Sequence, residues 1–330
     1  MREKKTSLAD LATSLGVSKA TVSFVLNGKG DEYHISKGMQ EKIHKKAKEM
    51  SYVPNFFAKS LRQGKTKTIG LVVADISNAF YAELCKSIQE KLYENGYNVL
   101  IVSSNDNIEV EQSLMNELIQ RSIDGMIVSP CNSIENLIPI LRSTHIPVVF
   151  TDRPGDGEAD FVGINNFKEA EKLVNLFSKK PKKLAILTQH STSIVTIQQR
   201  IEGIVKACND NKIEYFIKNL STDEIEINST INDLLKKGVD SFIPLNNKVA
   251  LRTLMSLKQL DIAIPKQARI ISFDDSEVFS YLTPPISALH QPIELIGHET
   301  SLRMLERLKE MERPGKHLML GCSFIERGSN

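Results

Sequence analysis

Apolar side chains recur at helical spacing along the first 50 residues and divide them into three short amphipathic segments. Gly16 follows the first segment, where a helix ending in a left-handed C-cap favours glycine. Ser18 and Ser36 stand where N-cap side chains would start a second and a third helix. The apolar stripes are Leu8, Leu11, Ala12 and Leu15; Val22, Val25 and Leu26; and Ile35, Met39, Ile43, Ala47 and Met50. Helices this short are unstable alone, so we expect the three to share one small core.

The second of these helices would turn small and polar groups outward: Lys19, Ala20, Thr21, Ser23 and Phe24. Such a surface can enter the major groove of DNA, about 12 Å wide, with Ser18 and the helix N-terminus against a phosphate. Two helices joined by a short turn with glycine are typical of DNA-binding heads. Other αα-hairpins share the pattern, so the stripes alone leave both interpretations open.

The next segment, SYVPNFFAKSLRQGKTKTIGLVV, begins at Ser51 and connects the three helices to the rest of the chain. We expect Pro54 to end the third helix and Asn55 to cap a short helix that carries Leu61. An apolar wedge flanked by cations, here Lys59 and Arg62, is what a protein that kinks DNA through the minor groove requires. A packed connector helix is the alternative.

From Thr68 onward, apolar strand-like runs alternate with amphipathic helical stretches, and a last helix is expected over residues 293–311. This alternation predicts an α/β fold of doubly wound parallel sheets. One set of runs precedes about residue 165 and a second follows it, which predicts two lobes joined by several crossovers. The predicted strands are TIGLVVAD, NVLIVSSN, GMIVSP, PVVFTD, KLAILTQ, YFIKNL, SFIPLN and RIISFDD.

Polar residues collect at the carboxyl ends of these runs, where parallel sheets bind ligands. Together with two aromatic residues in the first loop, Phe80 and Tyr81, they would line a cleft suited to a polyhydroxyl ligand such as a sugar. Each of these residues could equally make a turn or cap a helix. The polar residues are Asp75, Ser129, Asp152, Asn246, Asn247, Asp274 and Asp275.

The charge is unevenly distributed, although the net charge of the 330 residues is only +2. Residues 1–65 contain 13 lysines and arginines against 6 acidic residues, whereas the remainder contains 29 against 34. A basic head on a mildly acidic body indicates a polyanionic partner for the head, or else a solvated charged surface. No apolar run is long enough to span a membrane, and the first residues do not have the pattern of a secretory signal. The four cysteines are scattered without metal-ligand spacing, which is typical of reduced thiols.

Several motifs in one order resemble the lactose-repressor (LacI/GalR) family of bacterial transcription regulators. They are LADLATSLGVSKATVSFVLNG, the segment from Ser51, ADISNAFYAELCKSIQEKLYENGYNVLI, TDRP, QRIEGI, ISFDDS, LTPPISALHQPIELIGHE and IERGS, so the resemblance covers essentially the whole chain. It implies a helix-turn-helix head, a hinge helix that orders on operator DNA, and a periplasmic-binding-protein-like body that binds a small effector.

The resemblance also implies the site residues. DNA contacts fall on Ser18, Lys19, Ala20, Thr21, Ser23, Phe24 and Asn27 in the head and on Asn55, Lys59, Leu61 and Arg62 in the hinge. Effector contacts fall on Phe80, Tyr81, Ser129, Asp152, Thr196, Arg200, Asn246, Asp274 and Gln291. In the family the arginine at the position of Arg200 clamps a ligand hydroxyl or acid group; a solvent-exposed salt bridge is the alternative.

Two departures from the family pattern concern the head. Phe24 stands where an arginine is common, so a bidentate guanine contact is lost and apolar contact with a thymine methyl group is a candidate replacement. The connection before the third helix, GKGDEYHIS, is longer than usual and adds either contacts or only a looser loop.

The sequence therefore predicts a cytoplasmic, sequence-specific transcription regulator, most simply a repressor, with no cofactor, metal site or catalytic residue. We expect a head at 1–51, a hinge and linker at 52–67, and a body at 68–330. Lobe 1 would comprise about 68–165 and 293–320, and lobe 2 about 166–292 and 321–330. Double-stranded palindromic operator DNA, a sugar-like effector and a second copy of the chain are the expected partners. The last residues show no heptad tail, so a dimer and not a tetramer is expected. A transporter's solute-binding protein and a cytosolic enzyme are the alternatives.

Overall fold

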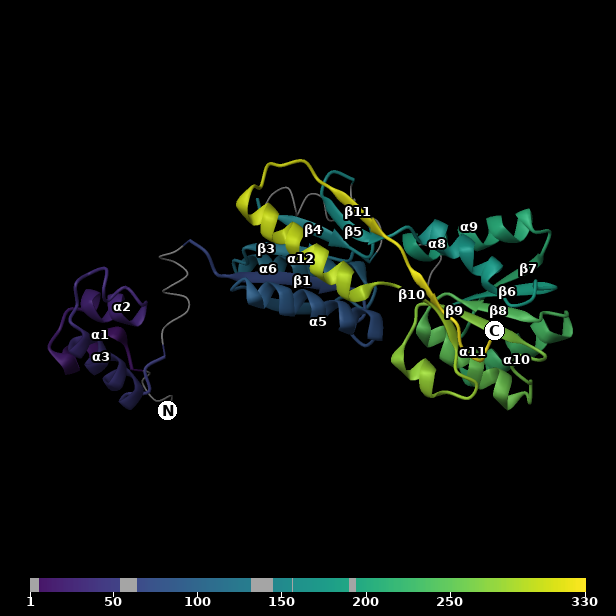
Figure 1. Cartoon of the computed structure of the whole chain (residues 1–330), viewed down its shortest axis with the longest axis horizontal. Helices are drawn as coiled ribbons and strands as arrows, with labels where there is room; N and C mark the ends of the chain where they lie inside the picture. Colours follow the sequence, from purple (N-terminus) through teal and green to yellow (C-terminus); the bar gives the residue numbers. More distant parts are fainter. Residues whose placement is uncertain (1–5, 54–63, 132–144, 156, 190–193) are drawn as a thin grey trace. The chain divides into compact units, whose positions relative to one another are not determined.

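The structure is a computed structural model, and it describes residues 6–53, 64–131, 145–155, 157–189 and 194–330 (Figure 1). The chain divides into two compact units, Met1–Thr66 and Lys67–Asn330. We call the first unit the head and the second the body.

The head contains three helices, α1 (Leu8–Leu15), α2 (Lys19–Leu26) and α3 (Lys37–Glu49). The predicted caps are confirmed: Gly16 ends α1 with φ of 66°, and the Ser18 and Ser36 side chains accept the backbone N–H groups of Thr21 and Met39. The buried side chains that the three helices share are Leu11, Ala12, Val22, Val25 and Ile43. Each helix therefore covers the apolar stripes of the other two.

The end of α3 corrects one prediction. The helix stops at Glu49 and Met50 is its C-cap, so Pro54 does not end it. Ser51 follows with φ of 47°, a left-handed conformation that already turns the chain out of the helix. Pro54 itself, like the predicted hinge helix, lies outside the described residues.

The first sheet of the body has the strand order β11-β5-β4-β3-β1-β2, and every neighbouring pair is parallel. Helices α5 (Ala79–Glu94) and α12 (Ile293–Lys309) pack on one face, and α6 (Ile108–Gln120) packs on the other. The alternation is visible within β1, where Ile69 and Leu71 face α5 and Val72 faces α6. The strands are β1 (Thr68–Val73), β2 (Asn98–Ser103), β3 (Gly125–Val128), β4 (Val148–Thr151), β5 (Asp160–Ile164) and β11 (His317–Leu320).

The second sheet has the order β12-β10-β9-β8-β6-β7. Helices α8 (Asn166–Leu173) and α9 (Val195–Asp210) cover one face, whereas α10 (Glu224–Lys236) and α11 (Asn247–Gln259) cover the other. Two short 3-10 helices, η2 (Val174–Leu176) and η3 (Glu277–Tyr281), complete this half of the body. The strands are β6 (Lys183–Thr188), β7 (Glu214–Asn219), β8 (Ser241–Pro244), β9 (Arg269–Phe273), β10 (Ser287–His290) and β12 (Ser323–Ile325).

Four strands were not among the predicted runs: β5, β10, β11 and β12. One of them also corrects the expectation of purely parallel sheets, because β12 pairs antiparallel with β10. Both β11 and β12 are edge strands of four and three residues with exposed positions, too short to give an apolar run. The last long helix ends at Lys309, two residues before the predicted end.

The chain passes between the two sheets three times, as Figure 1 shows: between β5 and α8, between β10 and α12, and between β11 and β12. The returning segment is fixed to the first sheet by Asp160, which is fully buried. Its carboxylate accepts hydrogen bonds of 2.9 Å from Arg307 in α12 and from Arg313 beyond it. Three separate connections therefore hold the two lobes of the body together.

Among the described residues, no helix combines the length and the apolar character that crossing a membrane requires.

Candidate DNA-binding surface and effector cleft

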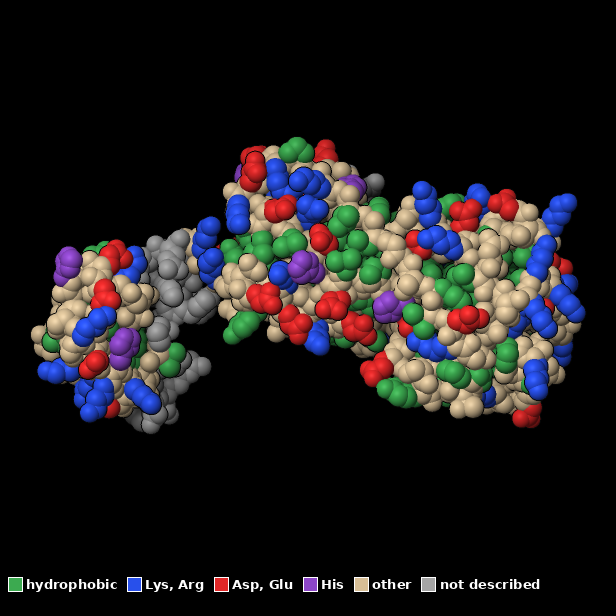
Figure 2. Space-filling model, viewed as in Figure 1, with side chains coloured by type: hydrophobic (Ala, Val, Ile, Leu, Met, Phe, Trp, Pro, Cys, Tyr) green, Lys and Arg blue, Asp and Glu red, His purple; other side chains and the backbone are tan. Residues whose placement is uncertain are grey.

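The outer face of α2 carries the predicted DNA-contact residues of the head. Lys19, Ala20 and Asn27 are exposed, whereas Thr21, Ser23 and Phe24 are half-buried. The Ser18 hydroxyl accepts the Thr21 N–H at 3.0 Å, so it fixes the first turn of the helix that would approach a phosphate. These seven residues are thus presented together on one helix and its two caps. Figure 2 shows Lys and Arg side chains, mixed with some acidic ones, on the face of the head that it presents.

One contact on this surface was missed by the sequence analysis. Phe24 stacks on Tyr33 from the long loop, with ring centroids 3.6 Å apart and planes 7° from parallel. The pairing joins residues nine positions apart across a non-helical loop, so no periodicity indicates it. The only signal was an aromatic residue in the loop that departs from the family pattern. The predicted hinge contacts Asn55, Lys59, Leu61 and Arg62 lie outside the described residues.

In the body, a cleft lies between the lobes at the carboxyl ends of the strands of both sheets. Eight of the nine predicted effector contacts line it: Phe80, Tyr81, Asp152, Thr196, Arg200, Asn246, Asp274 and Gln291. Asn246 also caps α11 by accepting the Val249 N–H at 2.9 Å, so its binding and capping interpretations both hold geometrically. Ser129 does not line the cleft. Asp75, which the strand-end pattern predicted, also lines the cleft, whereas Asn247 and Asp275 from the same pattern do not. The lining residues that no prediction included are Asn78, Asp106, Arg153, Ile194 and Ile197.

Ser129 lies behind the cleft and supports two of the lining side chains. Its hydroxyl donates to Asp152 at 3.2 Å, and Tyr81 donates to the same carboxylate oxygen at 2.8 Å. Burial raises the pKa of Asp152 and outweighs the opposing charge of Arg153. Burial and the nearby Asp152 charge likewise raise the pKa of Tyr81 well above its ordinary value. The tyrosine is therefore a neutral donor at pH 7.

Arg153, in the TDRP motif, is the principal charged residue that the prediction missed. It donates to Asp106 at 2.6 Å and to the Pro130 and Cys131 carbonyl oxygens at 3.1 and 3.0 Å. Burial alone would lower the pKa of this guanidinium, but Tyr81, Asp106 and Asp152 hold it above the usual value. Its Nε lies 3.8 Å from Asp152 and has no hydrogen-bond partner among the described residues. This donor is therefore buried beside the Asp152 carboxylate without a hydrogen bond to it.

Arg200 enters from the other lobe and is buried, which excludes the solvent-exposed salt bridge as its role. It donates from Nε to Asn166 at 2.8 Å, and from Nη1 to the Leu245 carbonyl at 2.8 Å and to Asp274 at 3.2 Å. Its guanidinium carbon lies 3.8 Å from the centre of the Phe273 ring. Gly203, one turn later in α9, allows α9 to pack closely against α8, the helix that contains Asn166. A Cβ at this position would clash with backbone atoms of Phe167.

Three hydrogen bonds at the rim join the lobes directly. Lys248 at the start of α11 donates to Asp75 at 2.7 Å and to Ser77 at 2.9 Å, and Asn247 donates to Asn78 at 3.1 Å. Burial would raise the pKa of Asp75, but the bonds from Lys248 and Ser77 lower it overall. The cleft encloses only about 50 Å³ in this state. Ordinary ligand pockets hold roughly 300–1,000 Å³, so the volume of this cleft lies well below that range.

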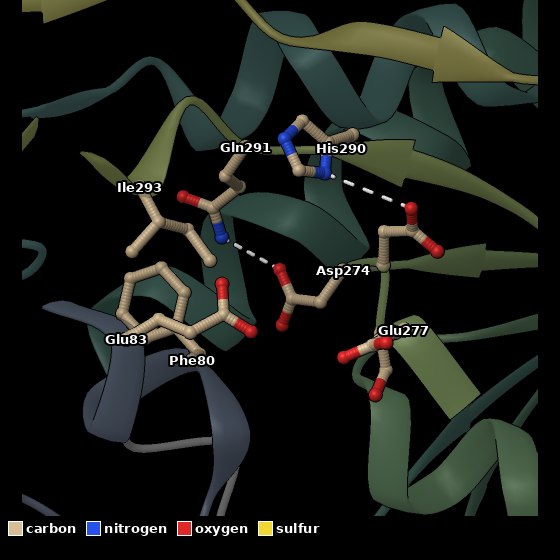
Figure 3. A pocket seen from close by; sticks show the side chains of 9 residues that line it. Phe80, Glu83, Asp274, Glu277, His290, Gln291 and Ile293 are labelled. Atoms are coloured by element: carbon tan, nitrogen blue, oxygen red, sulfur yellow. Dashed lines mark hydrogen bonds and ion pairs between the residues drawn. The ribbon is translucent and has the colours of Figure 1, made fainter. Parts of the chain in front are cut away.

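A second, wider cavity of about 210 Å³ shares Phe80, Asp274 and Gln291 with the cleft. Figure 3 shows Gln291 directed at Asp274, and the bond between them is 2.6 Å long. Glu83 and Glu277 add carboxylates to this cavity, and burial raises the pKa of Glu83. Among the described residues, no group of histidine, cysteine and acidic side chains has the geometry of a metal site. The cavity therefore adjoins the cleft, and α5 supplies two of its lining residues, Phe80 and Glu83.

Sequence comparisons cover both units. Residues 7–55 match the profile of the bacterial regulatory proteins of the lacI family, and residues 69–282 match a periplasmic binding protein domain. The chain belongs to the lacI family. Its relatives in that family include the HTH-type transcriptional regulator RegA of Clostridium saccharobutylicum, 29% identical over 98% of this chain and 99% of the relative. The HTH-type transcriptional repressor PurR of Vibrio atlanticus is 27% identical over 98% of each chain.

Solved structures agree with this assignment at the level of the fold. A lac repressor dimer bound to operator and the anti-inducer ONPF matches with a TM-score of 0.87 and 20% identity, over 99% of both chains. A periplasmic-binding ribose operon repressor protein from Lactobacillus acidophilus matches with a TM-score of 0.71 and 25% identity, over 80% of this chain and 98% of that one. As a lacI-family member, the protein is a DNA-binding transcription regulator with an effector-binding body.

Proposed function

We propose that the protein is a repressor whose affinity for operator DNA is set by a sugar-like effector bound between the two lobes. The observation that carries this proposal is the cleft, which places two buried arginines and four aspartates from both lobes around one small space. We further propose that the chain acts in the cytoplasm as a homodimer and performs no catalysis. Its domains would follow the boundaries expected from the sequence.

The chemistry of the cleft favours a ligand with several hydroxyl groups. Asp75, Asp106, Asp152 and Asp274 can accept hydrogen bonds, and the unpartnered Nε of Arg153 can donate one. Phe80 supplies an apolar surface for the ring carbons of a sugar. One similar structure is described as a ribose operon repressor and two others contain bound ribose, which supports the same ligand class.

The DNA contacts would be those predicted for α2 and the hinge. Two heads related by two-fold symmetry would read the two halves of a palindromic operator. The lac repressor with a similar fold is described as a dimer on operator, which supports this arrangement. Lys19 and the capped N-terminus of α2 would meet phosphates, while the outer side chains of α2 would meet base edges.

Effector binding would act through the relative position of the lobes. Because the cleft is narrow and bridged by Lys248, a ligand must enter a more open state and would then stabilise a different lobe arrangement. Only a ligand that binds the two arrangements with different affinity can change operator affinity. We propose that the hinge between head and body transmits this change.

The decisive experiment uses the full chain and the DNA upstream of its own gene. Gel-shift titration at low salt is expected to show a complex with a palindromic site, and one sugar from a thermal-shift panel is expected to change its affinity. Arg200→Ala should lose the response to that sugar. A protein that binds no operator-like duplex at low salt would overturn the repressor proposal, whereas DNA binding indifferent to every sugar would overturn only the ligand class.

A further inference from the structure

The most unusual feature of the head is a large aromatic side chain on the face of α2 that points away from the core. In α2 the residues that face the core are Val22 and Val25, and Phe24 lies on the opposite face with Ala20 one turn before it. Among the described residues, neither Phe24 nor Tyr33 belongs to the apolar cluster that forms the core of the head. The pair therefore does not serve to hold the three helices together.

The loop that carries Tyr33 is firmly built. Asp31 accepts hydrogen bonds from Lys37 at 2.7 Å and Gln40 at 2.9 Å, and Gln40 also donates to the Ile35 carbonyl. The Ile35 N–H returns to the Gly30 carbonyl at 2.8 Å, which closes the loop on itself. Tyr33 is thus held over one face of the Phe24 ring by a set of bonds that Phe24 does not provide. The longer loop therefore adds contacts within the head, which is the first of the two expectations for it.

The pair leaves a substantial apolar surface in water. Tyr33 is 47% exposed, and Phe24, on which its ring stacks, is half-buried. Lys19 is exposed on the same helix, and Lys29, at the start of the loop, is exposed with its ammonium group 3.6 Å from Glu32. An apolar platform on a helix and a loop that also carry lysines suits a surface that presents a methyl group near phosphates. In DNA that surface is thymine in the major groove, because only thymine shows a methyl group there.

We propose that Phe24 and Tyr33 together form one base-reading platform that selects thymine through its 5-methyl group, with Tyr33 as a specificity-determining residue. This inference rests on the proposed DNA-binding function and deepens it. Phe24 supplies the contact, and Tyr33 holds its ring in one orientation and widens the apolar surface. The role is specific to this loop, since a free phenylalanine on α2 would move among rotamers and select weakly.

The test begins with the full chain and a library of duplexes with randomised palindromic half-sites. In the selected duplex, each thymine is replaced in turn by deoxyuridine, which removes only the methyl group. At one position in each half-site the affinity per half-site is expected to fall about four-fold, the equivalent of one buried methyl group. Phe24→Ala and Tyr33→Ala should each bring this ratio close to one, whereas Tyr33→Phe should keep it.

Glu41→Ala is the matched control, because Glu41 is an exposed acidic residue of the same head but lies on α3, outside the loop that carries Tyr33 and Lys29. It should keep the thymine-to-deoxyuridine ratio even if overall affinity changes. Circular dichroism of each variant checks that the head still folds, as its core is untouched. A Tyr33→Ala variant that keeps the four-fold ratio, or a selected half-site in which no thymine methyl matters, overturns the platform while leaving DNA binding intact. Failure to select any duplex overturns the proposed function, and the platform with it.

Discussion

Arg200 offers the sharpest test of the cleft, because its removal should affect folding before any ligand is added. Arg200→Ala deletes three hydrogen bonds and leaves Asp274 buried without its ion-pair partner. Breaking a buried pair by removing one member costs about 3–5 kcal/mol. Asp274 keeps the 2.6 Å bond from Gln291, so we expect the lower end of that range, about 3 kcal/mol.

Calorimetry converts this figure into a temperature. For a domain of this size each kcal/mol moves Tm by about 2–4 °C, so the body transition should fall by roughly 6–12 °C. Arg200→Lys keeps the positive charge but loses the planar guanidinium that reaches Asn166 and Asp274 together. Its Tm should therefore lie between the Tm of the unsubstituted chain and that of Arg200→Ala. Scanning calorimetry of the unliganded full chain at pH 7 measures all three.

Arg121→Ala is the matched control. Arg121 pairs with Glu117 one turn earlier on α6 at 2.6 Å, but both side chains are more than half exposed. Exposed pairs of this spacing contribute about 0.2–0.5 kcal/mol, so its transition should move by no more than about 2 °C. If Arg200→Ala behaved like this control, the buried ion pair would not stabilise the second lobe, and the reasoning from burial would be refuted.

Three further predictions concern the rim, the buried carboxylate and the hinge. Lys248→Ala should lower the free energy of unfolding by at most about 1 kcal/mol, because the pair with Asp75 is partly exposed. In X-ray scattering without ligand, the headless Lys248→Ala protein should have a larger radius of gyration than the headless unsubstituted protein. An unchanged radius would contradict a role of Lys248 in closing the cleft. The pKa of Asp152 in the folded chain is raised above 3.8, so its protonation at low pH increases the free energy of unfolding. This stabilisation is lost as the pH rises through the raised pKa. Asp152→Asn should therefore be relatively more stable at pH 7 than at pH 4 in urea titrations compared with the unsubstituted chain, and a pH-independent difference would count against this. Leu61→Ala should weaken operator binding in gel shifts while leaving the calorimetric transition of the body in place; loss of that transition would show a core residue instead.

The sequence predicted those parts of the fold that depend on local patterns. The caps at Gly16 and Ser18, the alternation of apolar runs and helices, and the two sheets all follow from spacing within a few residues. The short edge strands β11 and β12 escaped because their pairing partners, β5 and β10, are distant in the chain. Their own residues are partly exposed and give no apolar run.

The features of the cleft likewise fall into those that the sequence predicts and those that it does not. Residues at strand ends, such as Asp152 and Asp274, could be predicted because parallel sheets place all strand ends on one edge. The bonds from Arg200 to Asn166 and to the Leu245 carbonyl join segments 34 and 45 residues apart. The stack of Tyr33 on Phe24 depends on the path of a nine-residue loop. Tertiary packing decides such contacts, and no single stretch of sequence encodes them.

The three passages of the chain between the sheets have a genetic consequence. Neither lobe corresponds to one uninterrupted stretch of codons, since β11 and β12 lie within nine residues of each other yet serve as edge strands of different sheets. A premature stop codon just after α12 would therefore strip an outer strand from both sheets at once. A truncation at that point should therefore destabilise both lobes together, whereas one between β11 and β12 would remove an edge strand from the second sheet alone.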